Sequence, residues 1–322
     1  MSMLIQAVER ADRIAIGGHV RPDGDCVGAC MGVYNYIREQ YPGKEISVYL
    51  EDIPNTLKFM QGTETILHEV PEGKDCQLFI ALDCGDMERL GFSASLFKRA
   101  ERTLCIDHHI SNQSFATENY IHGDASSTCE LICQLLPGEK ISRETAECLY
   151  TGIVHDTGVF RYTCTSPETM RMAAFLMEKG IDCSRIITET FDEKTYAQNQ
   201  VLGRSLLESF LFMDGHCIVS SISKKVMKFY GVQPKHLDGI VSQLKLTKGV
   251  DVAIFMYEVE NGVYKVSLRS SDAVDVSRIA QYFGGGGHVR AAGYSMKGTV
   301  YDVINNLSRE IEKQLCPGEE EE

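Results

Sequence analysis

The first half of the chain alternates short apolar runs with longer amphipathic stretches. The apolar runs predict four strands, at residues 13–18, 45–50, 77–83 and 103–107, and the stretch 27–40 has the spacing of a helix with one apolar face. Strands that alternate with helices are typical of an α/β domain with a mainly parallel sheet. We therefore predict this fold class for the first half.

A second segment with the same kind of pattern follows. It predicts strands near 216–221, 250–258 and 262–269, then a helix that ends before Gly284. We expect this segment to be a smaller α/β domain.

Between the two segments, the composition becomes polar. Residues 190–208 are compatible with a helix but have no long apolar stripe, so we expect a linker there, helical in form. The predicted division is therefore a first domain at 1–189 and a second domain at 209–322.

The bulk composition is that of an ordinary globular protein. The chain has 322 residues, of which 43% are apolar and 24% charged, and this length favours two domains. No apolar run is long enough to span a bilayer, and no charged leader precedes an apolar block, so we expect a cytoplasmic protein. The twelve cysteines are scattered without a Cys-x-x-Cys pair, which favours free thiols over a zinc site or a disulfide framework.

The net charge of −13 limits the size of the expected partner. Proteins that bind long nucleic acids usually carry a basic surface, because neutralising phosphates supplies most of their affinity. An acidic chain can still bind a small anion where cations and a few arginines supply local positive charge. We therefore expect no long duplex and no membrane as partner.

Carboxylates and histidines follow the predicted strands of the first domain. Each group comes just after an apolar run, except the last, which we expect on a helix. The residues are His19, Asp23 and Asp25, then Asp83, then Asp107, His108 and His109, and finally His155 and Asp156. Since the carboxyl ends of parallel strands line one crevice, these side chains are expected to meet there.

Five carboxylates cannot share one crevice as bare anions, because they would repel one another strongly. Divalent cations would remove this repulsion. Ligands of the imidazole and carboxylate type suit Mn²⁺, with Mg²⁺ or Co²⁺ as alternatives. Two such ions bridged by one carboxylate would form a centre for phosphoryl displacement.

These motifs resemble those of the DHH phosphoesterase superfamily. His19-x-x-x-Asp23-x-Asp25, Asp83, Asp107-His108-His109 and Asp156 match its successive motifs in order. The run from Gly284 to His288, followed by Ala291-Ala292-Gly293 and preceded by Ser267-Leu268-Arg269-Ser270, resembles the DHH-associated C-terminal domain. The resemblance implies an active site in the cleft between two domains.

The resemblance also implies a role for each matched residue. One metal ion would be bound by His19, Asp23 and Asp83, and the other by Asp25, Asp83, His108 and Asp156. Asp107 would orient a histidine, and His109 would act on the scissile phosphate or the leaving oxygen in its protonated form. The substrate would be held by Arg269, Gly285, Gly286, Gly287, His288 and Arg290, with the glycines in a loop. His155 receives no role.

Length and charge narrow the choice within the superfamily. Exonucleases of single-stranded DNA would be expected to carry an extra binding module and a more basic surface, and the pyrophosphatases have a different second domain. The compact form most resembles the bifunctional oligoribonuclease and pAp phosphatase group, sometimes called nanoRNases. A soluble phosphodiesterase of cyclic di-AMP or pApA is the alternative, and a nucleotide sensor without catalysis is disfavoured because no metal ligand is missing. A homodimer is compatible with the sequence.

Overall fold

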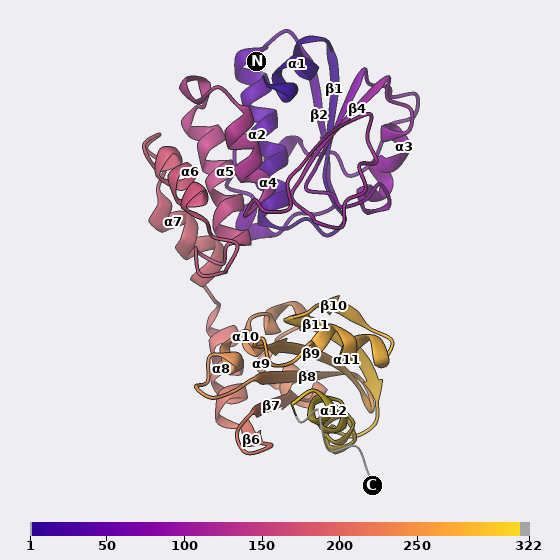
Figure 1. Ribbon diagram of the computed structural model, residues 1–322, viewed down its shortest axis with the longest axis vertical. Coiled ribbons are helices and arrows are strands. Elements are labelled where there is room, and N and C mark those ends of the chain that lie inside the picture. Colours follow the sequence, from indigo (N-terminus) through magenta and orange to yellow (C-terminus); the bar gives the residue numbers. More distant parts are fainter. Residues whose placement is uncertain (1, 316–322) are drawn as a thin grey trace. The chain divides into compact units, whose positions relative to one another are not determined.

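The computed structural model describes residues 2–315 of the chain. The chain divides into two compact units, Met1–Glu193 and Lys194–Glu322, and each is described here by itself (Figure 1). No helix within residues 2–315 combines the length and the apolar character that a membrane span needs.

The first unit is built on a five-stranded parallel sheet in the order β2-β1-β3-β4-β5. Its strands are β1 (Arg13–Gly17), β2 (Glu45–Tyr49), β3 (Leu78–Leu82), β4 (Arg102–Asp107) and β5 (Glu118–Ile121). The four predicted strands and the parallel sheet are confirmed. β5 was not predicted, because its residues are only half-buried and show no apolar run.

Helices cover both faces of this sheet (Figure 1). They are α1 (Met3–Glu9), α2 (Gly24–Gln40), α3 (Ala94–Phe97), α4 (Thr128–Leu135), α5 (Arg143–Asp156), α6 (Pro167–Met177) and α7 (Cys183–Ile187). Successive residues of one strand point to opposite faces. In β3, Leu78, Ile80 and Leu82 accordingly join the core beneath α2, α4 and α5, whereas Phe79 and Ala81 join a smaller core with Phe97 of α3.

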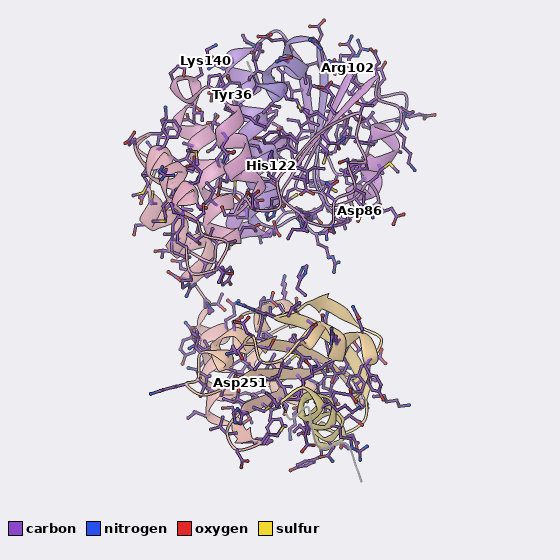
Figure 2. The ribbon with its side chains drawn as sticks, viewed as in Figure 1. Tyr36, Asp86, Arg102, His122, Lys140 and Asp251 are labelled. Atoms are coloured by element: carbon purple, nitrogen blue, oxygen red, sulfur yellow. The ribbon has the colours of Figure 1, made fainter. Side chains whose placement is uncertain are left out.

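The strand order creates a switch point beside β1. The chain passes from β1 to β2 on one side and then returns to place β3 on the other side, so the connections diverge at the carboxyl ends of β1 and β3. Ligands of open parallel sheets bind at such points. Figure 2 labels one residue near each end of the sheet, Arg102 at the start of β4 and Asp86 in the loop that follows β3.

The second unit contains a six-stranded mixed sheet in the order β10-β11-β9-β8-β7-β6, in which only β7 and β8 are parallel. The strands are β6 (Phe210–Phe212), β7 (Cys217–Ile222), β8 (Val252–Glu260), β9 (Val263–Ser270), β10 (Gly286–His288) and β11 (Ala291–Lys297). The three predicted strands correspond to β7, β8 and β9. The glycine run was expected to be a loop, and this was wrong for residues 286–288, which pair with β11.

Two helical layers flank this second sheet. The helices are α8 (Tyr196–Leu207), α9 (Lys224–Tyr230), α10 (Ile240–Lys245), α11 (Val276–Tyr282) and α12 (Val300–Leu315). One face of the sheet packs with α11 and α12, and the other with α8 to α10. Segment 190–208, which was expected as a linker, contains the end of a π-helix (Thr188–Asp192) and then α8. Val201 of α8 is buried in the core between the second sheet and helices α8 to α10.

Candidate metal centre

The side chains that follow β1 and β3 meet at the switch point of the first sheet. His19 lies two residues after the end of β1, and Asp23 caps the amino end of α2, where its side chain accepts a hydrogen bond from the backbone amide of Cys26. Asp25 lies in the first turn of α2. Asp83 directly follows β3, which is the neighbour of β1 in the sheet. Topology therefore gathers residues that are about sixty positions apart in the sequence.

His19 forms the first cluster with two carboxylates. Its Nε2 lies 3.6 Å from Asp23 Oδ1 and 3.4 Å from Asp83 Oδ2, while Nδ1 lies 2.9 Å from the carbonyl oxygen of Val20. If Nδ1 carries the proton and donates a hydrogen bond to the carbonyl oxygen of Val20, the lone pair of Nε2 faces the carboxylates when the ring is neutral, as in a metal ligand. Burial opposes a charged ring, but hydrogen bonds to Asp23 and Asp83 outweigh it and raise the pKa of His19.

His108 forms the second cluster. Its Nε2 lies 3.1 Å from Asp156 Oδ2, 3.6 Å from Asp83 Oδ1 and 4.0 Å from Asp25 Oδ2. Burial raises the pKa of Asp156 to about 6, and the pKa of His108 rises to about 10 because its acidic neighbours outweigh the effect of burial. Three groups of side chains here could hold a metal ion: His19, Cys26 and Asp83; Asp83, His108 and His109; and Asp25, His108 and Asp156.

Asp83 is common to both clusters. Its Oδ2 faces His19 and its Oδ1 faces His108, so the two oxygens of one carboxylate point toward different groups of ligands. The residue is 2% exposed and has a φ of 53°, in the left-handed region that non-glycine residues rarely adopt. The backbone is therefore held in an unusual conformation at the position that joins the clusters.

Asp25 is fully buried and held by the amino end of α4. Its oxygens accept hydrogen bonds from the backbone amides of Thr128 (2.7 Å) and Cys129 (3.0 Å), and the Thr128 hydroxyl donates to Asp83 Oδ1 (3.1 Å). Despite these donors, burial and the nearby charges of Asp83 and Asp156 raise the pKa of Asp25.

The excess negative charge of this site is what a cation would balance. Asp25, Asp83 and Asp156 form ion pairs with the imidazoles of His19, His108 and His109. Buried carboxylates in excess over cationic partners are strongly disfavoured unless they bind a metal ion or take up protons. The donor set of this cluster therefore fits divalent cations.

Asp107 and His109 form a separate pair beside Asp83. Asp107 Oδ1 lies 2.7 Å from His109 Nδ1, and its Oδ2 accepts a hydrogen bond of 2.6 Å from the amide of Asn112. The bond to Asp107 raises the pKa of His109. Burial opposes the charge of Asp107, but the hydrogen bonds from His109 and Asn112 lower its pKa below the usual value. With Nδ1 held in this way, His109 has Nε2 left for other partners.

His155 packs against the amino end of α2, where Asp23 and Asp25 lie. A Cβ atom at Gly24 would lie 2.2 Å from its Cγ, so the ring occupies the space above this glycine, between Asp23 and Asp25. Its Nε2 lies 2.9 Å from Thr190 Oγ1 in the π-helix. Burial lowers the pKa of His155.

Three contributors were not identified from the sequence. Thr128 and Asn112 were assigned no site role from the sequence, and Cys26 was included only among the free thiols. Their contacts with Asp83, His19 and Asp107 arise from tertiary packing. Of the three, only Cys26 could have been suspected from the sequence, because it directly follows the Asp-x-Asp motif.

The residues expected to bind substrate lie on one edge of the second sheet. Arg269 of β9 is opposite Ala291 of β11, which is in turn opposite His288 of β10. Directly opposed residues point to the same face, so Arg269 and His288 share a face with only a methyl group between them, about 10 Å apart across two strand spacings. Arg290 forms an ion pair with Asp272 instead.

The glycine run fits against β11. Gly287 has a φ of 145°, and a Cβ atom there would lie 2.5 Å from both the Ala291 carbonyl oxygen and the Ala292 Cα. A Cβ atom at Gly286 would meet nothing within 4 Å. Gly287 is therefore required by the hairpin, whereas Gly286 leaves open space on an exposed strand.

Comparison with known proteins agrees with this arrangement. Residues 13–153 match the DHH family N-terminal domain, and residues 214–315 match the DHHA1 domain. The chain is 30% identical over 302 residues to the bifunctional oligoribonuclease and PAP phosphatase NrnA of Thermus thermophilus, covering 93% of this chain and 88% of the relative. It is 26% identical over 318 residues to the protein of the same name from Bacillus subtilis, covering 97% of each.

A solved structure shares the fold. The exopolyphosphatase-related protein from Bacteroides fragilis matches with a TM-score of 0.87 and 28% identity, covering 96% of this chain and 94% of that chain. The two domain matches follow one another in the order that the motifs of the sequence indicated. Since the Thermus thermophilus relative is 30% identical along most of both chains, this protein belongs to the DHH family.

Proposed function

We propose that this protein is a metal-dependent phosphoesterase that hydrolyses very short RNA oligonucleotides, such as dinucleotides, to mononucleotides. We further propose that it removes the 3′-phosphate of 3′-phosphoadenosine 5′-phosphate (pAp) to give AMP. The observation that carries the proposal is the shared carboxylate of Asp83, whose two oxygens face two groups of potential metal ligands. Relatives named as bifunctional oligoribonucleases and PAP phosphatases support the choice of substrates.

The metal centre would hold two divalent cations, with Mn²⁺ as the expected ion because imidazole and carboxylate ligands suit it. His19, Asp23 and Asp83 would hold one ion, and Asp25, Asp83, His108 and Asp156 the other. When bound, the two cations supply charge stabilisation for the phosphate and activation of water. Asp25 is kept in place for this task by two amides of α4, and Asp83 by the Thr128 hydroxyl.

His109 would serve as the proton donor. Asp107 accepts a hydrogen bond from Nδ1 and favours the charged ring, so Nε2 carries a proton that can be given to the leaving oxygen of the ester. Asn112 holds the other oxygen of Asp107, which fixes the direction of the carboxylate and, through it, the plane of the His109 ring.

The second unit would bind the nucleotide part of the substrate. Arg269 and His288 offer positive donors on one face of the β9–β11–β10 edge, and the open space at Gly286 allows an anion to approach the backbone, while Gly285 and Gly287 fit closely against β11. Arg290 would contribute to the charge of this edge. The protein is expected to act in the cytoplasm.

Turnover of three substrates in parallel tests the proposal. The purified protein would be given Mn²⁺ with a 5′-phosphorylated RNA dinucleotide, pAp or cyclic di-AMP. Rapid cleavage of the dinucleotide, with or without pAp, is the expected result. Preference for cyclic di-AMP would replace this proposal by a cyclic dinucleotide phosphodiesterase. No turnover of any of them would leave a binding protein without catalysis.

A further inference from the structure

Cys26 brings a sulfur atom into the first group of metal ligands. Its Sγ, a ring nitrogen of His19 and a carboxylate oxygen of Asp83 all lie within 4.8 Å of one another. All three side chains are buried, with exposed fractions of 0% for Cys26, 4% for His19 and 2% for Asp83. The soft sulfur donor of Cys26 therefore lies close enough to the harder nitrogen and oxygen donors of His19 and Asp83 to bind the same metal ion.

The fold holds the thiol in this position. Cys26 lies in the first turn of α2, and its backbone amide donates to Asp23 Oδ1, another proposed ligand. Next to His19, Gly18 has no side chain, and a Cβ atom there would lie 2.3 Å from the Cys26 Sγ. The end of β1 thus leaves room at Gly18 for the sulfur beside the His19 ring.

The spacing of the other ligands suits a tetrahedral ion. Two ligand atoms bound at about 2.1 Å to one tetrahedral ion lie about 3.4 Å apart. The observed separations from His19 Nε2 are 3.4 Å to Asp83 and 3.6 Å to Asp23. Sulfur as a fourth donor would complete the set, and sites of mixed nitrogen, oxygen and sulfur favour thiophilic ions such as Zn²⁺, Fe²⁺ or Co²⁺ over Mn²⁺.

We propose that Cys26 is a metal ligand of the first site, and that this site takes a thiophilic divalent cation while the second site keeps only nitrogen and oxygen ligands. On binding, a sulfur–metal bond forms, the S–H bond breaks, and its proton leaves to solvent. The inference rests on the metal centre of the proposed function and replaces Mn²⁺ by a thiophilic ion at the first site only.

Cobalt spectroscopy on the full-length protein tests this inference. Metal-free protein is titrated with Co²⁺ without oxygen, and two signals are followed: the visible ligand-field bands, which report bound Co²⁺, and the near-ultraviolet band of thiolate-to-cobalt charge transfer. The matched variants are Cys26→Ser and Cys30→Ser. Cys30 is one helical turn further along α2, is equally buried, and also lies against Gly18.

Both bands are expected in the wild type and in Cys30→Ser, with loss of the charge-transfer band alone in Cys26→Ser. Ligand-field bands without charge transfer in the wild type, or a charge-transfer band that survives in Cys26→Ser, would overturn the assignment. In either case, Mn²⁺-dependent cleavage of the dinucleotide would show that the proposed function still stands. Absence of all cobalt bands would also overturn the assignment of Cys26, and Mn²⁺-dependent cleavage would then decide the proposed function separately.

X-ray absorption of the wild-type protein gives a second readout that needs no variant to fold. With one equivalent of Zn²⁺ or Co²⁺ bound, a sulfur neighbour at about 2.3 Å is expected in the first coordination shell. A shell of nitrogen and oxygen only would rule out Cys26 as a ligand.

Discussion

At the scale of single residues, the pair formed by Asp107 and His109 controls where a proton is held. The hydrogen bond that His109 donates to Asp107 raises the pKa of His109, so the ring keeps its proton to a higher pH than a free histidine would. Replacing Asp107 by Asn removes that charge, and the pKa of His109 should fall. We therefore expect Asp107→Asn to lower kcat and to move its alkaline decline toward lower pH.

The measurement is the pH profile of kcat for dinucleotide cleavage at saturating metal. Asp52→Asn serves as the control, because Asp52 is a fully exposed carboxylate of the same unit. An alkaline limb that stays in place in Asp107→Asn would show that His109 is not the group that titrates.

The close packing of His155 on Gly24 can be tested by its effect on metal binding. Gly24→Ala would place a methyl group where the His155 ring lies, and overpacking of this kind costs about 1–3 kcal/mol. Because Gly24 separates Asp23 from Asp25, we expect weaker metal binding and lower kcat. His155→Ala should restore space, so the double variant is expected to bind metal better than Gly24→Ala alone.

Isothermal titration with Mn²⁺ on the three variants checks this coupling. Gly43→Ala is the matched control for the glycine change, since a Cβ atom there would meet nothing within 4 Å. Equal metal affinities of Gly24→Ala and the double variant would mean that His155 does not affect the positions of Asp23 and Asp25 at the amino end of α2.

Site residues at the ends of strands could be predicted from the sequence, but the residues that donate hydrogen bonds to them could not. His19, Asp83 and Asp107 follow apolar runs, so topology alone indicated a common edge. Thr128 and Asn112 contact Asp83 and Asp107 only because α4 and a loop pack there, and no periodicity marks such a contact. The assignment of individual metal ligands stays a prediction until an ion is observed.

At the scale of elements, the edge formed by β9, β11 and β10 would let residues from separate motifs bind one ligand. Arg269 of β9 and His288 of β10 lie on the same face of the sheet, and Ala291 of β11 lies between them. A hydrogen bond to a charged group is worth about 1.5–3 kcal/mol, or roughly 10–100-fold in affinity. We expect Arg269→Ala and His288→Ala each to raise KM by this factor with little change in kcat.

Steady-state kinetics with the dinucleotide measure this effect. Lys265→Ala is the control, since Lys265 lies on the same strand and the same face as Arg269 but four residues away. An unchanged KM with a collapsed kcat would instead assign Arg269 or His288 to stabilisation of the transition state.

The elements found from the sequence are those with buried apolar runs. β3 is buried at all five positions and was predicted without difficulty. β10 is exposed at all three positions and consists of two glycines and a histidine, so no strand pattern exists to detect. Short edge strands are held by pairing with a neighbour, and that information lies elsewhere in the chain.

At the scale of the whole molecule, the two units have separate hydrophobic cores and differ in the number of buried carboxylates among the described residues. Within residues 2–315, the buried carboxylates all lie in the first unit, so a cation should stabilise that unit alone. A metal ion at about 100 times its Kd would add about 2.7 kcal/mol to the free energy of unfolding. We expect Mn²⁺ to slow hydrogen exchange around β1, β3 and β4, and to leave the second unit unchanged.

Hydrogen–deuterium exchange with mass spectrometry, with and without Mn²⁺, locates this effect. Asp83→Ala should lose both the protection and all turnover, because both proposed sites share this carboxylate. Turnover that survives in Asp83→Ala at saturating Mn²⁺ would contradict the bridging role, and equal protection in both units would contradict a single binding unit.

The left-handed backbone of Asp83 has a consequence for how this sequence is inherited. A non-glycine residue in that conformation costs about 1–2 kcal/mol, and its charge also repels the buried Asp25 when no cation is bound. Asp83→Gly would relieve both penalties at once. Random variants screened only for abundance or heat resistance should therefore become enriched in a chain that folds better and has lost its chemistry, so at this codon only selection for turnover keeps the aspartate.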